Sequence, residues 1–125
     1  MKLRELIETF DEKQKMTVLR SYEREGIPDL DLELETEVNR QVLEFLKAIS
    51  NPLRFQMLKL LSKGWLCVCV ISGALGRDQT LISHHLRTLK EAGLILEKKV
   101  GKMHFYRTDV ERFERYLEAV KSEIL

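Results

Sequence analysis

Residues 78–93 constrain the fold most strongly, because their pattern fits a helix with two chemically different faces. One face has mostly apolar side chains at the i, i+3, i+4, i+7 spacing of a buried stripe: Ile82, His85, Leu86 and Leu89. The opposite face has no large apolar residue: Thr80, Ser83, His84 and Arg87. Asp78 can cap the start of this helix, and Gly93 can end it. Short donors and an arginine on an exposed helix are suited to reading base edges in a DNA major groove.

A second helix is predicted just upstream of this segment. Asn51 is a good N-cap, Pro52 suits the first helical position, and an apolar run follows until Gly64 stops the helix. The next apolar stretch, residues 66–75, ends at Gly76, which forms a tight corner before the helix at 78–93. Two short helices joined by a glycine-containing turn predict a helix-turn-helix.

A β-hairpin is predicted after Gly93. Residues 94–99 and 103–107 are β-prone runs on either side of a Val-Gly-Lys turn, and residues 103–106 alternate as in a half-buried strand. The tip is basic and carries Lys98, Lys99 and Lys102. A hairpin placed after a reading helix is a wing, which can lay its lysines along the phosphate backbone.

The last predicted helix begins with residues 108–111, which fit a capping box with Thr108 as the N-cap. Its apolar stripe is wide for a helix with so little left to cover, and comprises Phe113, Tyr116, Leu117, Val120 and Ile124. We interpret the stripe as a contact with a second subunit. The expected fold is therefore mostly α with a small β-hairpin wing: a winged helix-turn-helix that dimerises through its terminal helices.

Charge is unevenly distributed along the 125 residues, although the net charge is only +1. Residues 1–49 have a net charge of −4, residues 50–107 of +7 and residues 108–125 of −2. The basic block coincides with the predicted helix-turn-helix and wing, where phosphate contacts are needed.

Residues 1–36 are predicted to be a separate N-terminal helical arm, and residues 37–125 the winged helix-turn-helix with a C-terminal dimerisation helix. One amphipathic helix is expected in the arm, ending near Gly26 with Pro28 beyond it; its apolar residues are Leu3, Leu6, Ile7, Phe10 and Val18. The acidic run at 29–37 is interpreted as a solvated face. A further helix is expected over residues 38–49.

Three segments resemble the ArsR/SmtB family of metal-sensing winged-helix repressors. They are the Leu-Lys-Ala-Ile-Ser-Asn-Pro-Leu-Arg-Phe run from Leu46, the recognition-helix run from Gln79, and Gly-Lys-Met-His-Phe-Tyr-Arg from Gly101. The resemblance covers about residues 46–107. It implies a homodimer that binds an inverted-repeat operator in double-stranded DNA, represses, and is released by an effector.

In that reading, two groups of side chains contact DNA. The residues expected to read or flank bases are Gln79, Thr80, Ser83, His84 and Arg87. The residues expected to contact phosphate are Lys98, Lys99, Lys102 and Arg107. His85 points inward and is expected to pack or to hydrogen-bond to the backbone, and Trp65 is interpreted as a packing residue under a helix start.

Cys67 and Cys69 are the candidate effector site. Leu-Cys-Val-Cys resembles the core of the arsenite-sensing members, although Trp65 and Val70 stand where those members usually have acidic residues. The implied effectors are arsenite, antimonite or another thiophilic metal ion, with oxidation of the pair as an alternative. Two cysteines at i and i+2 diverge on a helix but lie on one side of an extended turn. The other interpretation is that both are small buried packing residues.

The sequence argues against several other classes of protein. It has no catalytic Ser/His/Asp pattern, phosphate loop or zinc-protease motif, so no enzyme and no required cofactor are expected. No secretory signal or membrane span is apparent, so a cytoplasmic location is expected. The alternative function is a winged-helix protein-interaction module in a transcription or repair assembly. Such a module should display apolar anchors on the outer face of residues 78–92.

Overall fold

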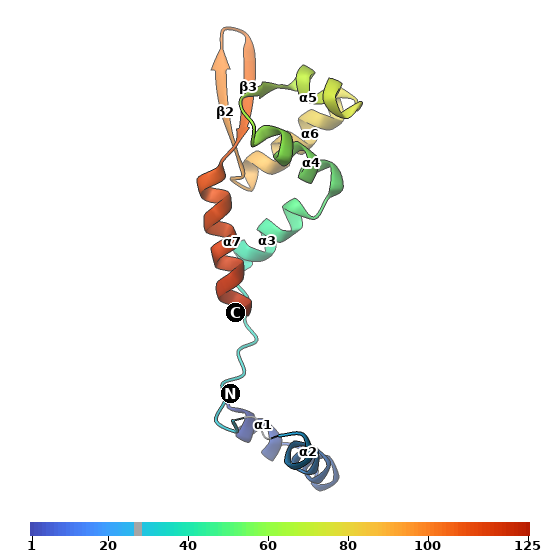
Figure 1. Cartoon of the computed structure of the whole chain (residues 1–125), viewed down its shortest axis with the longest axis vertical. Helices are drawn as coiled ribbons and strands as arrows, with labels where there is room; N and C mark the ends of the chain where they lie inside the picture. Colours follow the sequence, from blue (N-terminus) through green and yellow to red (C-terminus); the bar gives the residue numbers. More distant parts are fainter. Residues whose placement is uncertain (27–28) are drawn as a thin grey trace. The chain divides into compact units, whose positions relative to one another are not determined.

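The computed structural model describes residues 1–26 and 29–125, which fall into two compact units, Met1–Glu37 and Val38–Leu125. The first unit contains the helices α1 (Leu3–Glu8) and α2 (Glu12–Glu25) (Figure 1). The second contains, in chain order, α3 (Arg40–Ile49), α4 (Pro52–Leu61), β1 (Leu66–Cys67), α5 (Val68–Leu75), α6 (Gln79–Glu91), β2 (Ile95–Val100), β3 (Met103–Thr108) and α7 (Val110–Ile124).

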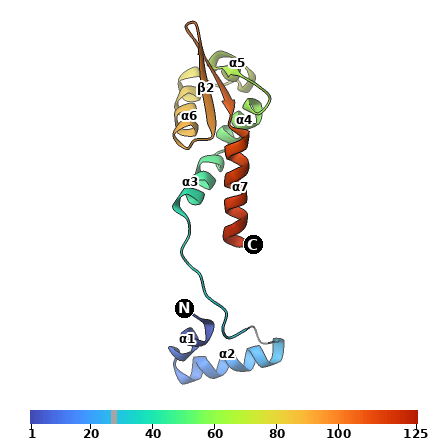
Figure 2. The ribbon, with the colours of Figure 1, turned by 90° about the vertical axis from the view of Figure 1, so that its left-hand side faces the viewer.

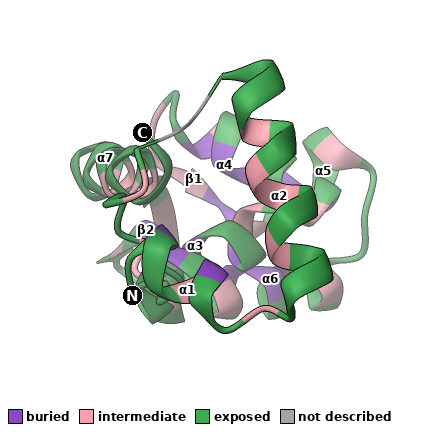
Figure 3. Cartoon of the chain, turned by 90° about the horizontal axis from the view of Figure 1, so that it is seen from below, coloured by how far each residue is buried: buried purple, intermediate pink, exposed green. Residues whose placement is uncertain are grey.

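The N-terminal unit has two helices where we expected one, so that prediction was wrong. Asp11 interrupts the helix because its carboxylate accepts a hydrogen bond from the backbone N–H of Gln14 at 2.8 Å and starts a new helix. Gly26, with φ of 102°, ends α2 as expected. Pro28, expected beyond that end, lies outside the described residues. No residue of α2 is buried, as Figure 3 shows.

The acidic run forms part of this unit through its backbone. The N–H groups of Leu3 and Arg4 donate to the carbonyl oxygens of Leu32 and Leu30 at 2.9 and 2.8 Å. These bonds satisfy donors at the start of α1 that have no partner inside the helix. The run is therefore a backbone partner for α1 as well as the solvated acidic face we predicted.

The second unit begins with two helices, of which α4 has the predicted Asn51 cap, while α3 begins at Arg40, two residues after the expected start, because Asn39 is its cap. The side chains of Asn39 and Asn51 accept hydrogen bonds at the starts of α3 and α4. The last turn of α4 closes at Ser62, whose N–H donates to the carbonyl oxygen of Leu58 at 2.9 Å. The helix therefore stops before Gly64, which we had expected to end it.

The predicted hairpin is confirmed, and a third strand joins it. The sheet has the order β1-β3-β2 with antiparallel pairing, and β1 pairs through Leu66 with Tyr106 and through Cys67 with Phe105. Gly101 has φ of 61° at the tight turn between β2 and β3, a conformation that favours glycine. The hairpin projects beyond the helices (Figure 2). The alternation expected for residues 103–106 is wrong, because Met103 and His104 are both exposed and Phe105 and Tyr106 are both half-buried.

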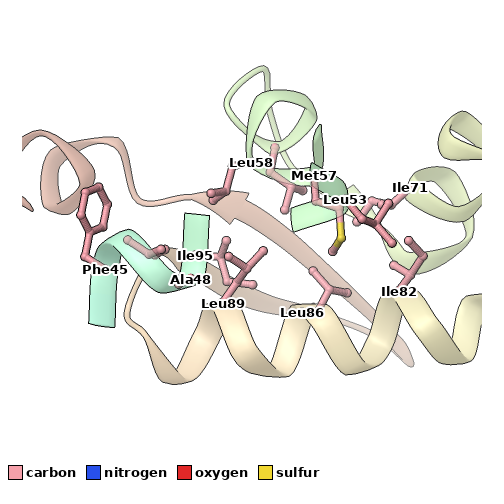
Figure 4. Close-up of a cluster of buried hydrophobic side chains, with 12 residues drawn as sticks. Phe45, Ala48, Leu53, Met57, Leu58, Ile71, Ile82, Leu86, Leu89 and Ile95 are labelled. Atoms are coloured by element: carbon pink, nitrogen blue, oxygen red, sulfur yellow. The ribbon is translucent and has the colours of Figure 1, made fainter. Parts of the chain in front are cut away.

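The core of this unit lies between α4, α5, α6 and the base of the sheet. Figure 4 shows Ile82, Leu86 and Leu89 pointing from α6 toward Leu53 and Met57 of α4. The inward stripe predicted for residues 78–93 is confirmed, and His85 is buried with it. Among residues 1–26 and 29–125, no helix combines the length and apolar content needed to cross a membrane.

The start of α7 differs from the prediction. Asp109, not Thr108, is the N-cap, and its carboxylate accepts from the N–H of Arg112 at 3.0 Å. Thr108 is buried instead, and its hydroxyl donates to the carbonyl oxygen of Leu58 at 2.9 Å. This bond joins the end of β3 to α4.

The apolar stripe of α7 divides into an inner and an outer part. The ring of Phe45 on α3 stacks on Tyr116 at 4.9 Å between centroids and meets the edge of Phe113 at 5.2 Å. Val120 also packs against the core. Leu117 and Ile124 remain 47% and 78% exposed. Part of the stripe thus packs within its own chain, and part of it is free for another contact.

Candidate nucleic-acid interface and effector site

The outer face of α6 carries the side chains that we predicted to read DNA. The side chain of Asp78 caps the helix by accepting from the N–H of Thr80 at 3.0 Å. All five residues of the predicted base-reading set are exposed: Gln79, Thr80, Ser83, His84 and Arg87. None of the exposed large hydrophobic residues in the described chain lies on α6. The face is thus polar and lacks the apolar anchors of a protein-binding surface.

The corner before α6 is set by Gly76. Its φ of 61° is left-handed, so an L residue with a Cβ would be strained there. The hydroxyl of Ser72 donates to the carbonyl oxygen of Arg77 and closes the same turn. These two features fix where α6 begins relative to α5.

The inner face of α6 is held by Arg54, a residue that our reasoning from sequence missed. Its Nε donates to the carbonyl oxygen of Ala48 at 2.7 Å, and its Nη1 lies 3.3 Å from Nδ1 of His85. Burial lowers the pKa of His85, and the charges of Arg54 and His84 lower it further. His85 is structural, as expected, but its partner is a side chain rather than the backbone.

The wing carries four residues predicted to contact phosphate, and they differ in their surroundings. Nζ of Lys98 lies 5.4 Å from the ring centre of Trp65, a cation–π contact that engages both side chains. Trp65 is therefore a partner of the wing rather than a packing residue under a helix start. Lys99, Lys102 and Arg107 are exposed and have no ion-pair partner within the described chain.

Our reasoning from sequence also missed Glu97, an acidic residue on β2 of the wing. Glu97 accepts from Nζ of Lys90 at 2.5 Å and pairs with Nδ1 of His104 at 2.8 Å. The hydrogen bond from Lys90, followed by that from His104, lowers the pKa of Glu97. The only signal in the sequence was that Glu97 is the one acid among residues 94–107.

The two cysteines meet where β1 becomes α5. Cys67 ends β1 in an extended conformation with ψ of 166°, while Cys69 lies in the first turn of α5. This break in the helix brings the two Sγ atoms to 2.8 Å, with Cys67 buried and Cys69 exposed. The hydrogen bond with Cys69, aided by the N–H of Val70, lowers the pKa of Cys67, and the same pairing raises the pKa of Cys69.

The donor set suits a thiophilic ligand but supplies only two sulfur atoms. No group of three or more His, Cys, Asp or Glu side chains converges on a metal site anywhere in residues 1–26 and 29–125. Tetrahedral zinc would need four donors. Further donors would have to come from outside this chain.

Comparison with known proteins places this geometry in a family. Residues 51–96, from the cap of α4 into β2, match the family model described as bacterial regulatory protein, arsR family. The chain is 38% identical over 85 residues to an uncharacterised HTH-type transcriptional regulator of Methanocaldococcus jannaschii; the match covers 67% of this chain and 96% of that one. It is 41% identical over 66 residues to the arsenical resistance operon repressor of Escherichia coli K12, covering 52% of this chain and 56% of that one.

Solved structures agree with these matches. A homodimeric winged helix-turn-helix DNA-binding domain from Mycobacterium bovis, a possible ArsR-family regulator, is 32% identical with a TM-score of 0.55. The alignment covers 74% of this chain and 94% of the solved one. The regulator from M. jannaschii is matched over nearly its whole length, and the fold is that of a DNA-binding domain. The chain therefore belongs to the arsR family of bacterial regulatory proteins and is a winged helix-turn-helix transcriptional regulator.

Proposed function

We propose that the protein is a homodimeric repressor that binds an inverted-repeat operator and is released by thiol chemistry at Cys67 and Cys69. The observation that carries this proposal is the 2.8 Å separation of the two Sγ atoms at the junction of β1 and α5. A pair of thiols with one lowered pKa suits a soft metal or metalloid. Relatives of this chain include an arsenical resistance operon repressor and a cadmium resistance regulatory protein.

DNA recognition in this proposal uses α6 for bases and the wing for phosphates. The exposed donors on α6 would enter the major groove, with Arg87 as the side chain best able to bond a guanine in bidentate fashion. The phosphates would be neutralised by Lys99, Lys102 and Arg107. Lys98 would contact a phosphate either by breaking its contact with Trp65 or by reaching beyond the ring. The polar outer face of α6 favours this function over the protein-interaction alternative.

The dimer interface that we propose uses the outer part of the α7 stripe. Leu117 and Ile124 are exposed, and α3 adds Leu43, which is 52% exposed. Phe113, Tyr116 and Val120 would support this surface from behind through their contacts with Phe45 and the core. The M. bovis relative is itself homodimeric. Residues 1–36 would form an additional N-terminal arm.

The position of the cysteines provides the link from effector to DNA. Cys67 pairs with Phe105 in β3, a strand of the wing, and Cys69 belongs to α5, which leads into α6 through Gly76. A ligand that draws both thiolates into one donor set would disturb this strand–helix junction. Its remaining donors would come from solvent, a small thiol or the partner subunit.

The experiment is a titration of the protein with a fluorescent duplex from its own upstream region and with a scrambled duplex of equal length. We expect preference for the upstream duplex, and release on addition of arsenite, cadmium ion or a mild thiol oxidant. The Cys67→Ser/Cys69→Ser double variant should bind as tightly and fail to respond. If wild type binds the upstream duplex no more tightly than the scrambled duplex at low salt, the proposed repressor function is wrong. If the double variant responds as wild type does, the cysteines are packing residues.

A further inference from the structure

Glu97 occupies an unusual place for an acid. It lies on the wing, in the most basic part of the chain, and its side chain is 22% exposed. A carboxylate near a surface that receives phosphates weakens binding by repulsion. A side chain at this position that only faced solvent would be better neutral or basic.

The contacts of Glu97 explain what the acid does. One carboxylate oxygen bonds Lys90 in the last turn of α6, and the other bonds His104 on β3. Glu97 itself lies on β2, so a single side chain joins the reading helix to both strands of the wing. Salt bridges of this kind contribute most when several partners form a network.

Lys90 and Glu97 also line a cleft between α6 and the wing. The cleft has a volume of about 170 Å³ and is lined by Ser83, Leu86, Arg87, Lys90, Glu97 and Tyr106. Ser83, Arg87 and Lys90 fall at i, i+4 and i+7, so they share the wing side of α6. Two of them belong to the base-reading set, so Glu97 holds the wing against the side of the helix that approaches DNA.

We propose that Glu97 is a positioning residue that fixes the angle between α6 and the wing and thereby sets the sequence specificity of DNA binding. This inference rests on the proposed DNA-binding function. The helix and the wing contact different parts of the duplex, so they can bind together only when their spacing matches the operator. A loose wing would still find phosphates on any duplex, but it would no longer favour the operator.

This role predicts opposite effects on general affinity and on specificity. Glu97→Gln removes a negative charge, so the affinity for scrambled DNA should stay the same or increase. The ratio of operator to scrambled affinity should fall by about threefold or more, as expected for coupling within a charged network. Glu91→Gln is the matched control, because Glu91 is an exposed acid of α6 without an ion-pair partner in the described chain. It should leave the ratio unchanged.

A charge swap provides the decisive test. Lys90→Glu, Glu97→Lys and the double variant are compared with wild type on both duplexes, at equal salt and after thermal unfolding confirms folding. Each single variant should lower the affinity ratio, and the double variant, which restores the pair with reversed charges, should return it to within about twofold. Additive effects, or a Glu97→Lys variant that binds both duplexes more tightly by the same factor, would show that Glu97 acts only by repulsion.

Hydrogen exchange of the free protein separates this inference from the proposed function. The amides of β2 and β3 should exchange faster in Glu97→Gln than in wild type and should recover protection in the charge swap. This readout needs no operator. A wild type that discriminates no duplex overturns the repressor proposal, whereas unchanged wing protection overturns the role of Glu97.

Discussion

Nη1 of Arg54 lies 3.3 Å from Nδ1 of His85, so a residue near the start of α4 contacts the buried side of α6. A guanidinium can only donate, so Nδ1 must accept and the ring proton sits on Nε2 of a neutral imidazole. Arg54 also donates to the carbonyl oxygens of Ala48 and Lys47 at the end of α3. One side chain therefore joins three helices, including the one proposed to read DNA.

Replacing Arg54 should destabilise the fold. Arg54→Ala leaves the carbonyl oxygen of Ala48 without this donor and removes the partner of His85, which should cost about 2 kcal/mol of unfolding free energy. Arg54→Lys keeps the charge but lacks the planar fork, so it should recover only part of the loss. Urea unfolding monitored by circular dichroism measures both. Equal stability of Arg54→Ala and wild type would mean that the contacts contribute nothing.

His85 should make stability depend on pH. Its pKa lies below the ordinary value of 6.5 because of burial and the nearby charge of Arg54, so the folded protein binds this proton less tightly than the unfolded chain. The contribution of neutral His85 is complete above pH 6.5 and is lost as pH falls below 6.5 toward the lowered pKa. His85→Gln should flatten the acid side of the stability profile. His84→Gln is the comparison: it should retain most of the slope, because the charge of His84 is the smallest of the three causes that lower the pKa of His85.

The buried hydroxyl of Thr108 should contribute measurably to the free energy of unfolding. Thr108→Val keeps the shape but removes the hydrogen bond to the carbonyl oxygen of Leu58, which should cost about 1 kcal/mol. Thr108→Ser keeps the bond and loses one methyl group. Had Thr108 been the helix cap, serine would serve as well as threonine, and valine would lose helix content in α7. Thermal unfolding and the helical signal of the three proteins together distinguish the two roles.

Local signals in the sequence were sufficient for most of the fold. The apolar spacing of residues 78–93, the Asn51 cap and the glycine turn of the hairpin each act within a few residues, and the structure confirms them. β1 could not be predicted, because a two-residue strand has no period and exists only through its pairing with β3. Thr108 is not the cap because its hydroxyl donates to the carbonyl oxygen of Leu58, which lies fifty residues away in the sequence.

The same distinction applies to the candidate site. The outer face of α6 was predictable because the apolar spacing identifies the buried side of the helix, and the remaining side must then be exposed. Arg54 with His85, and Glu97 with Lys90, involve side chains that only the packing of different elements brings together. The cysteines are an intermediate case. Their i, i+2 spacing allowed a shared site only if the helix was interrupted, and the junction of β1 and α5 supplies that interruption.

The proposed dimer surface can be tested at one exposed leucine. Leu117→Asp places a charge in an apolar contact, so the protein should become monomeric in light scattering and bind the operator much more weakly. Ser122→Asp is the control, because Ser122 is exposed on the same helix but points away from the face that Leu117 and Ile124 share, so this variant should remain dimeric. The helical signal should match wild type in both, because neither side chain is buried. If Leu117→Asp remains dimeric, the interface lies elsewhere, and the N-terminal arm is the first candidate.

Arg87 and Lys102 should affect DNA binding in different ways. If Arg87 makes a bidentate contact with a base, Arg87→Ala should cost about 1–3 kcal/mol of operator affinity and relax the preference at one base pair. Lys102 lies at the wing tip, so Lys102→Ala should weaken all duplexes alike and reduce the slope of log affinity against log salt by about one. Binding is measured over a salt series with the operator, single-base variants and a scrambled duplex. Uniform loss across duplexes for Arg87→Ala would place its guanidinium on the phosphate backbone. A loss for Lys102→Ala confined to the operator would place the wing tip in contact with bases.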